Sequence, residues 1–199
     1  MLRSLVLMAC AAAAFGQELK PVIDNQRVTV WDVTWTKGQT NPARGHDRDA
    51  VIMWVAGNKA GTAKFSPKGD RRDEHGVADT NPPRSVIIEL KDYRVPPIEN
   101  KTGYPLAFPR PHVKKLLENN RVIVWSYRWN PGEPTPMHFH DKDVVVVYLE
   151  DTALVSTTPD GAKKLNQYKA FDIRFNKGNR THTELLARGT GSAMMMELK

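Results

Sequence analysis

The stretch that decides the fold of this chain is Gly132-Glu-Pro-Thr-Pro-Met-His138-Phe-His140-Asp-Lys-Asp143, followed by the apolar run from Val144 to Leu149. Side chains two positions apart in a β-strand point to the same face, so His138 and His140 would lie side by side. A third imidazole, His182, follows a glycine-containing turn further along the chain. Neutral imidazoles from two different strands predict a transition-metal site inside a small β-barrel.

The spacing of these residues resembles the cupin family. Gly132 stands six positions before His138, as in the first cupin motif, G(x)5HxH(x)3-4E. The second motif is matched more loosely, at Ala170 to Asp172 and at Gly178 to His182. The likeness covers the chain from about residue 119 to the C-terminus, and more faintly the first half. It implies an all-β cupin (jelly-roll) barrel with His138, His140 and His182 as metal ligands.

The chain departs from the first motif at its glutamate. That residue would fall at Val144 or Val145, and neither side chain can bind a metal. Asp143 is a candidate fourth ligand, although regular alternation along the strand would turn it away from the histidines. The resemblance therefore implies a three-histidine site for one divalent transition metal. Iron is the first expectation, with Mn, Zn, Ni and Cu as alternatives.

An internal repeat divides the chain into two halves. The stretch from Asn25 to Gly38 matches that from Asn119 to Gly132 without a gap, and Arg27 and Arg121 are 94 positions apart (121 − 27 = 94). The C-terminal parts of the two halves match at a larger offset, so the first copy lacks the hairpin around Gly161. We expect a bicupin of two tandem repeats, residues 17–91 and residues 113–199.

The metal site is predicted in the second copy alone. Arg44 stands where the second copy has His138, which leaves His46 and His75 as remnants of a site. We interpret the first copy as a degenerate cupin retained for packing or for a homodimer. The alternative is that Arg44 binds a carboxylate or a phosphate.

Between the copies, residues 92–112 contain five prolines. Proline disfavours helix and central strand, so we expect an extended linker that lies over one barrel, with His112 exposed. Residues 114–117 are expected to begin a short helix. The Trp-x-x-x-Trp pair in each half and the methionines at 194–196 are expected to fill the core.

The N-terminal residues 1–16 have the pattern of a secretory signal peptide: a basic start, an apolar run and small residues before Gln17. Lipidation at Cys10, the one cysteine of the chain, is the alternative. We expect an exported protein, periplasmic or extracellular, with no membrane attachment after the leader is removed. The formal charge of +7 is scattered along the chain. This favours small anionic partners over nucleic acid.

The resemblance implies several chemistries for a three-histidine site without the glutamate. Our first hypothesis is a dioxygenase-like oxidoreductase that acts on a small organic substrate. The alternative is a non-catalytic barrel that binds a metal or a small ligand, and a third hypothesis is a purely structural repeat protein. The sequence identifies no catalytic acid or base, and Glu133, Asp141 and Glu184 are candidates by proximity alone.

Overall fold

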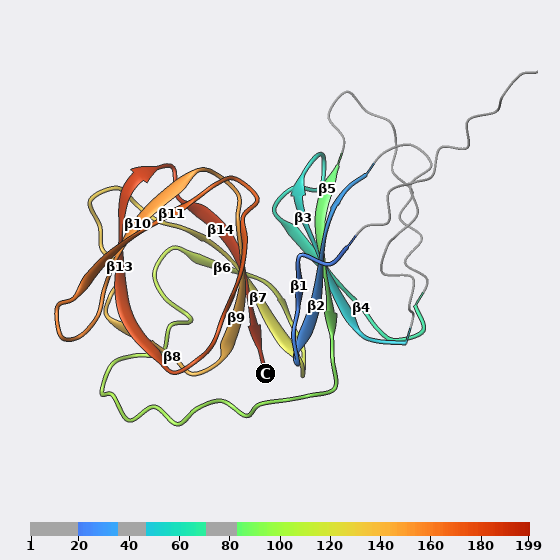
Figure 1. Ribbon diagram of the computed structural model, residues 1–199, viewed down its shortest axis with the longest axis horizontal. Coiled ribbons are helices and arrows are strands. Elements are labelled where there is room, and N and C mark those ends of the chain that lie inside the picture. The colour runs from blue at the N-terminus through green and yellow to red at the C-terminus, as the bar shows by residue number, and fades with distance from the viewer. Residues whose placement is uncertain (1–19, 36–46, 71–82) are drawn as a thin grey trace, which may run out of the picture.

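The computed structural model describes residues 20–35, 47–70 and 83–199, and every regular element in these ranges is a β-strand (Figure 1). The first half forms one antiparallel sheet of five strands in the order β1-β2-β5-β3-β4. Its strands are β1 (Ile23–Asp24), β2 (Val28–Thr34), β3 (Ala50–Ala56), β4 (Thr62–Ser66) and β5 (Arg84–Leu90). No helix in the described ranges is long and apolar enough to cross a membrane.

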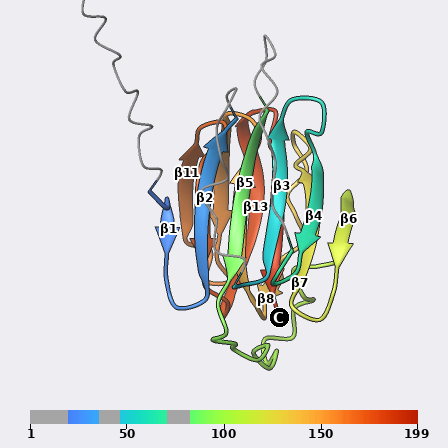
Figure 2. The ribbon, with the colours of Figure 1, turned by 90° about the vertical axis from the view of Figure 1, so that its right-hand side faces the viewer.

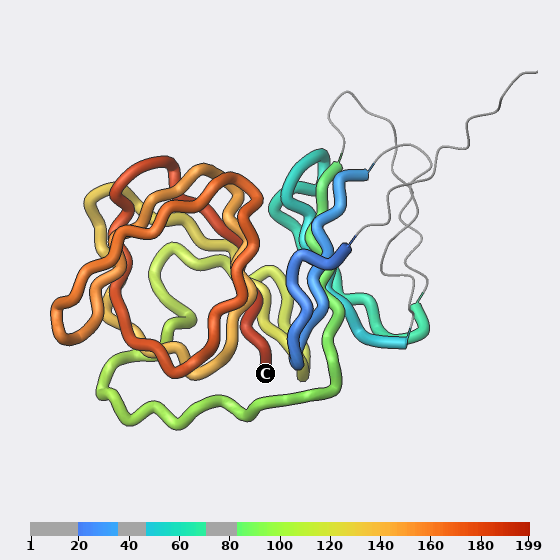
Figure 3. Tube along the Cα trace, in the orientation of Figure 1, coloured from blue at the N-terminus to red at the C-terminus, as the bar shows by residue number. Residues whose placement is uncertain are grey.

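The second half forms two antiparallel sheets that face each other as a barrel (Figures 1 and 3). One sheet has the order β12-β9-β14-β7-β6 and the other β11-β10-β13-β8. Their strands are β6 (Val113–Glu118), β7 (Val122–Arg128), β8 (His138–His140), β9 (Asp143–Tyr148), β10 (Thr152–Thr157), β11 (Lys163–Tyr168), β12 (Ile173–Asn176), β13 (Arg180–Gly189) and β14 (Ser192–Leu198). Large buried side chains, among them Trp125, Trp129 and Tyr148, fill the space between the two sheets.

The first-half sheet repeats one sheet of the barrel. Its order β1-β2-β5-β3-β4 corresponds strand for strand to β6-β7-β14-β9-β12. The turn between β3 and β4 is short, whereas the hairpin of β10 and β11 lies between β9 and β12. This correspondence is compatible with two repeats. The described part of the first half forms a single sheet and not a closed barrel, and Arg44, His46 and His75 lie outside the described residues.

The first-half sheet packs flat against the outer face of the matching barrel sheet (Figure 2). Alternation along each strand separates the two faces: Met194 and Met196 point into the layer between the sheets, whereas Met195 points into the barrel. The layer is apolar and fully buried, with side chains such as Val30 and Ile88 from the first half. The methionines therefore pack in the core, as predicted.

Residues 92–112 join the halves without forming a regular strand or helix. In Figures 1 and 3 this segment (green) runs below the barrel and then turns up towards its interior. It pairs with the edge strand β8: the amide of Ala107 donates to the carbonyl of Phe139 (2.8 Å), and that of Phe139 donates to the carbonyl of Pro105 (2.8 Å). The segment therefore covers the edge of the sheet that carries His138 and His140.

The helix expected at residues 114–117 is wrong, because these residues belong to the edge strand β6, which pairs with β7. The register of this pair shifts between Lys115 and Leu117. A shift of this kind adds one residue and breaks the alternation of period two. As a result Leu116 and Leu117 both pack on the core, and the sequence loses its strand pattern at this place.

Candidate metal centre

Three buried imidazoles meet inside the barrel. His138 and His140 lie on β8, and His182 lies directly opposite His138 on β13. The Nε2 atom of His140 is 3.2 Å from that of His138 and 3.3 Å from that of His182. Nitrogen atoms about 2.0–2.1 Å from one ion would be roughly 2.8–3.4 Å apart in octahedral or tetrahedral geometry. Both separations fall in this range, and the ligand nitrogens of the three rings all lie within 4.8 Å of one another, so the cluster could hold one transition-metal ion.

Hydrogen bonding sets the tautomer of His138. Its Nδ1 is 2.7 Å from the carbonyl oxygen of Pro136, which can only accept, so Nδ1 carries the proton. The Nε2 atom then carries the lone pair of the ring, on the side that faces His140. A backbone carbonyl that fixes the tautomer in this way is the usual partner of a metal-binding histidine.

Burial keeps all three imidazoles neutral. It lowers the pKa of His138 to about 4, with a further contribution from the charge of Arg110. Burial and the charge of Arg180 hold the pKa of His140 well below its ordinary value. The pKa of His182 is lowered by burial, while Glu184 opposes the shift. Neutral imidazole is the form that binds metals, so the site is in its ligand-competent state at neutral pH.

At two glycines of the motifs, the structure explains why a residue with a side chain does not fit. Gly132 has φ of +79° in the turn before β8, a region that side chains with a Cβ rarely adopt. A Cβ at Gly178 would lie 3.1 Å from the backbone carbon of Lys142, so a side chain there would force the two turns apart. The amide of the next residue, Asn179, donates to the carbonyl of His140 (2.8 Å). This contact joins the end of β8 to the turn before β13.

The structure does not bring Asp143 to the histidines. Its carboxylate accepts from the guanidinium of Arg27 (3.0 Å) and from the amide of Gly178 (2.8 Å). Val144, the neighbouring position in the motif, points into the barrel core. Regular alternation in β9 therefore places Asp143 on the outer face, where it holds the first half of the chain. Among the described residues, the group that could hold a metal consists of the three histidines.

Arg110 is the site residue that the sequence did not reveal. Its side chain is 5% exposed, and its Nη1 lies 3.1 Å from Nε2 of His138. The guanidinium stacks on the rings of Tyr127 (4.1 Å) and Phe108 (4.9 Å). It comes from the proline-rich segment, which carries no metal motif, and only the pairing of that segment with β8 brings it to the cluster. Two residues on, His112 is largely exposed, as expected.

Glu184 is the one of the three proximity candidates that reaches the cluster. It lies two positions after His182 on the same face of β13, with Oε1 3.8 Å from Nε2 of His182. Its Oε2 accepts from the indole of Trp129 (3.1 Å) and lies 3.7 Å from Arg110. Burial raises the pKa of this carboxyl, but Arg110 and the histidines outweigh burial and leave the pKa below its ordinary value. Glu184 is thus an anion beside the site.

The other two candidates lie elsewhere. Glu133 is mostly exposed and lies 3.6 Å from His112. Asp141 pairs with Lys142 (2.7 Å) at the turn after β8. Neither carboxylate belongs to the histidine cluster.

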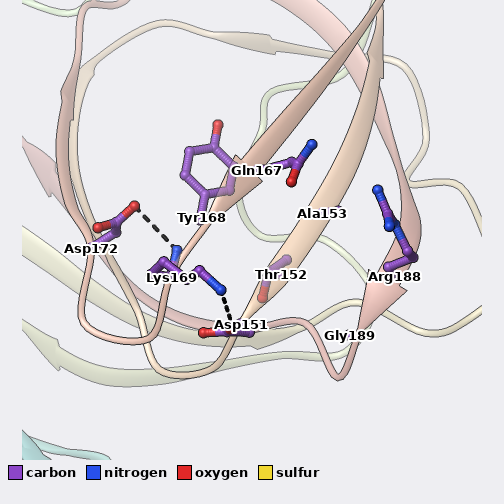
Figure 4. Close-up of a pocket in the computed structure, with 9 residues that line it drawn as sticks. All are labelled: Asp151, Thr152, Ala153, Gln167, Tyr168, Lys169, Asp172, Arg188 and Gly189. Carbon is purple, nitrogen blue, oxygen red and sulfur yellow. Dashed lines mark hydrogen bonds and ion pairs between the residues drawn. The ribbon is translucent and has the colours of Figure 1, made fainter.

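Two cavities open on the barrel. A cavity of about 120 Å³ has Arg110 and His138 in its wall, together with five apolar residues: Pro105, Leu106, Pro109, Pro111 and Pro136. A larger cavity of about 250 Å³ lies between the far ends of β10, β11 and β13 (Figure 4). There, Lys169 pairs with Asp151 (2.8 Å), and its backbone amide donates to Asp172. None of the three histidines lines the larger cavity, so we assign the smaller cavity to the site.

By sequence, the chain is similar to a known protein over a short stretch. No family model matches the chain. A 60-residue stretch is 42% identical to the "Beta-alanine degradation protein BauB" of Pseudomonas aeruginosa, covering 30% of this chain and 59% of that relative. The chain thus spans less than two thirds of the relative's length.

Solved structures extend the likeness to most of the chain. The putative glyoxylate-induced protein of Pseudomonas aeruginosa is 15% identical with a TM-score of 0.60, covering 87% of this chain and 75% of that one. A cupin 2 conserved barrel protein from Leptotrichia buccalis is 13% identical with a TM-score of 0.52, covering 90% and 87%. The Mn(II)-containing oxalate decarboxylase of Bacillus subtilis is 10% identical with a TM-score of 0.51, covering 87% and 68%. These likenesses show that this chain has the cupin fold.

Proposed function

We propose that this protein is a metal-dependent cupin oxidoreductase, dioxygenase-like, that acts on a small organic molecule. The observation that supports it is the convergence of three Nε2 atoms at 3.2 and 3.3 Å, all on neutral, buried rings. Three ligands on one side of an ion leave coordination positions for a substrate and for O₂. Iron at this site would supply the redox chemistry that lets O₂ react with an organic molecule.

The residues around the histidines support a reaction in a site with little water. The ring of Phe108 lies edge-on to that of His140, and further aromatic side chains, Trp129 and Tyr148 among them, fill the barrel. Glu184 is placed to accept a proton from a bound substrate, since its carboxylate is ionised and lies beside His182. The adjoining cavity of about 120 Å³ is small compared with the roughly 300–1,000 Å³ of pockets for drug-sized ligands. A substrate of only a few heavy atoms fits it.

A second candidate is a non-catalytic barrel that binds a small ligand. It is favoured by the contact of Arg110 with His138, which satisfies the imidazole lone pair without any ion. Uptake of O₂ that depends on a substrate separates the two functions. A tightly held zinc ion without O₂ uptake favours the binding protein.

We also propose that the protein is exported, to the periplasm or outside the cell. The proposal is supported by the leader pattern of residues 1–16, which lie outside the described residues. A measurement of the mass of the protein recovered from the periplasm, with cleavage before Gln17, tests it.

Metal content tests the function directly. The full chain is produced with its own leader and purified without added metal, beside a His138→Ala/His140→Ala variant and a His112→Ala control, whose imidazole is 54% exposed. We expect about one equivalent of a transition metal in the wild type and the control, and none in the double variant, because a site with one imidazole left cannot hold the ion. A wild type that contains no metal and melts at the same temperature as the double variant would contradict the proposed enzymatic function.

A further inference from the structure

The guanidinium of Arg110 has an N–H donor without a hydrogen-bond partner among the described residues. Its Nε is buried and has no hydrogen-bond partner among the described residues. Its Nη1 meets only the Nε2 lone pair of His138, and its Nη2 lies 3.7 Å from Glu184. Buried polar groups are nearly always hydrogen-bonded, and an unpaired donor on a charged group is costly. Such a group indicates a ligand.

Metal binding removes the one acceptor that Nη1 has. Because Nδ1 of His138 donates to Pro136, the ring offers a single lone pair, on Nε2. That lone pair can accept from Arg110 or bind an ion, but it cannot do both. Loading the site therefore leaves Nη1 without a partner, as Nε already is among the described residues.

The charges around the cluster also require an anion. Arg110 and Arg180 both lie close enough to the histidines to lower the pKa of His140. A divalent ion would add two further positive charges, and among the described residues Glu184 is the carboxylate that pairs with both Arg110 and His182. Counting Arg110, the ion and Glu184, the site would then carry a net charge of about +2 in a region with little water, where unscreened repulsion is strong.

From these observations, we propose that Arg110 is the anchor for a carboxylate on the substrate, bound by the guanidinium beside the metal. The inference rests on the proposed metal-binding function and adds the class of substrate. A carboxylate oxygen can accept a charge-assisted hydrogen bond from Nη1, and the planar guanidinium fixes the direction of that bond. The walls of the adjoining cavity are mostly proline and leucine, so the rest of the molecule is short and apolar.

Binding of acetate to the cobalt(II)-loaded full chain tests the proposal. Calorimetry measures the dissociation constant, and the visible absorption of cobalt reports whether the ligand lies near the ion. Acetamide serves as the uncharged analogue of the same shape, and inorganic phosphate as the tetrahedral anion. The variants are Arg110→Gln and Arg110→Lys, with Arg128→Gln as the control because its side chain is 60% exposed and lies on β7 away from the cluster.

We expect acetate to bind the wild type and Arg128→Gln equally, and acetamide and phosphate to bind more weakly. Arg110→Gln should weaken acetate about tenfold to a hundredfold, because it loses charge-assisted hydrogen bonds. Arg110→Lys keeps the charge but loses the planar guanidinium, so its affinity for acetate should lie between those of the wild type and Arg110→Gln. Cobalt content should remain near one equivalent in every variant.

Three results would overturn the proposal while the metal site stands: equal acetate affinity in Arg110→Gln and the wild type, acetamide binding as tightly as acetate, or phosphate binding more tightly than acetate. A wild type that holds no cobalt would mean instead that the proposed function fails, and the inference with it. If circular dichroism shows that Arg110→Gln is unfolded, Arg110→Lys decides the question. An unchanged acetate affinity in that variant counts against the proposal.

Discussion

The two halves of this molecule present the same sheet in the same strand order, yet the described residues place a histidine cluster in only one of them. The two halves meet through the same face of this sheet. Arg27 of the first half pairs with Asp143 of the second (3.0 Å), and Arg121 of the second pairs with Asp49 of the first (2.9 Å). Both arginines also donate to a backbone carbonyl across the same interface.

This reciprocal pattern is that of an isologous interface, in which residue i contacts j and j contacts i. Here it occurs within one chain, where the first-half sheet covers the outer face of the barrel as a partner subunit would. The site, in contrast, needs elements that lie beyond the shared sheet: β8, β13 and residues 92–112. The comparison teaches that packing and chemistry depend on separate parts of the repeat. A homodimer, one of the two roles that the sequence leaves open for the first copy, would have to use another face.

The largest expected effect tests whether the halves form one cooperative unit. Ile88 and Met196 are fully buried in the layer between the sheets, one from each half. Ile88→Ala and Met196→Ala should each lower the free energy of unfolding by about 2–5 kcal/mol, because each leaves a cavity in the same core. Chemical denaturation followed by tryptophan fluorescence should show a single transition in both. Two transitions, with only one moved by Ile88→Ala, would show that the halves unfold separately.

Acidification should lower the free energy of unfolding through the buried histidines of the second half. Burial lowers the pKa of His138 to about 4 in the folded protein, against its ordinary value of 6.5. As the pH falls from 6.5 towards 4, the unfolded chain therefore binds a proton that the folded chain does not, and stability is lost. For His138 alone the loss is about 3 kcal/mol, and His140 and His182 add to it.

Denaturant unfolding of the metal-free protein between pH 8 and pH 4 measures this loss. The His138→Ala variant should show a shallower decline than the wild type, since one of the titrating groups is gone. His112→Ala, whose imidazole is mostly exposed, should follow the wild type. Identical slopes in His138→Ala and the wild type would contradict the assignment of the pH dependence to this cluster.

The smallest expected effect concerns the reciprocal ion pairs. Double-mutant cycles to alanine for Arg27 with Asp143, and for Arg121 with Asp49, should each give coupling energies of about 1–3 kcal/mol, because both pairs are mostly buried. The exposed pair of Lys169 and Asp151 should give roughly 0–1 kcal/mol. Coupling in one interface pair only would show that the two halves do not meet symmetrically.

The sequence predicted the all-β cupin fold and the three histidines because both depend on local patterns. Strand alternation puts His138 and His140 on one face, and pairing with β13 supplies His182. Alternation also predicted that Asp143 would turn away, and the structure shows it bound to Arg27. The expected helix at residues 114–117 failed because a register shift in β6 removes the alternation on which the reading depends.

Arg110 could not be found from the sequence, because its role depends on where residues 92–112 run in space. Nothing in a run of prolines indicates that the segment will pair with β8 and carry a guanidinium to within 3.1 Å of His138. Glu184 was named for its place two positions after His182, but its partners Arg110 and Trp129 come from elsewhere. Such contacts join residues far apart in the chain.

By itself, then, the sequence determined the barrel, its three clustered histidines and the likeness of the two halves, since these depend on periodicity, motif spacing and direct comparison of the two halves. The tertiary structure decided what surrounds the histidines: a buried cation, an ionised carboxylate and a small apolar cavity. It also decided that the halves meet through reciprocal ion pairs. The physical reason is that burial and charge act through space, so the environment of a side chain is known only when the whole chain is folded.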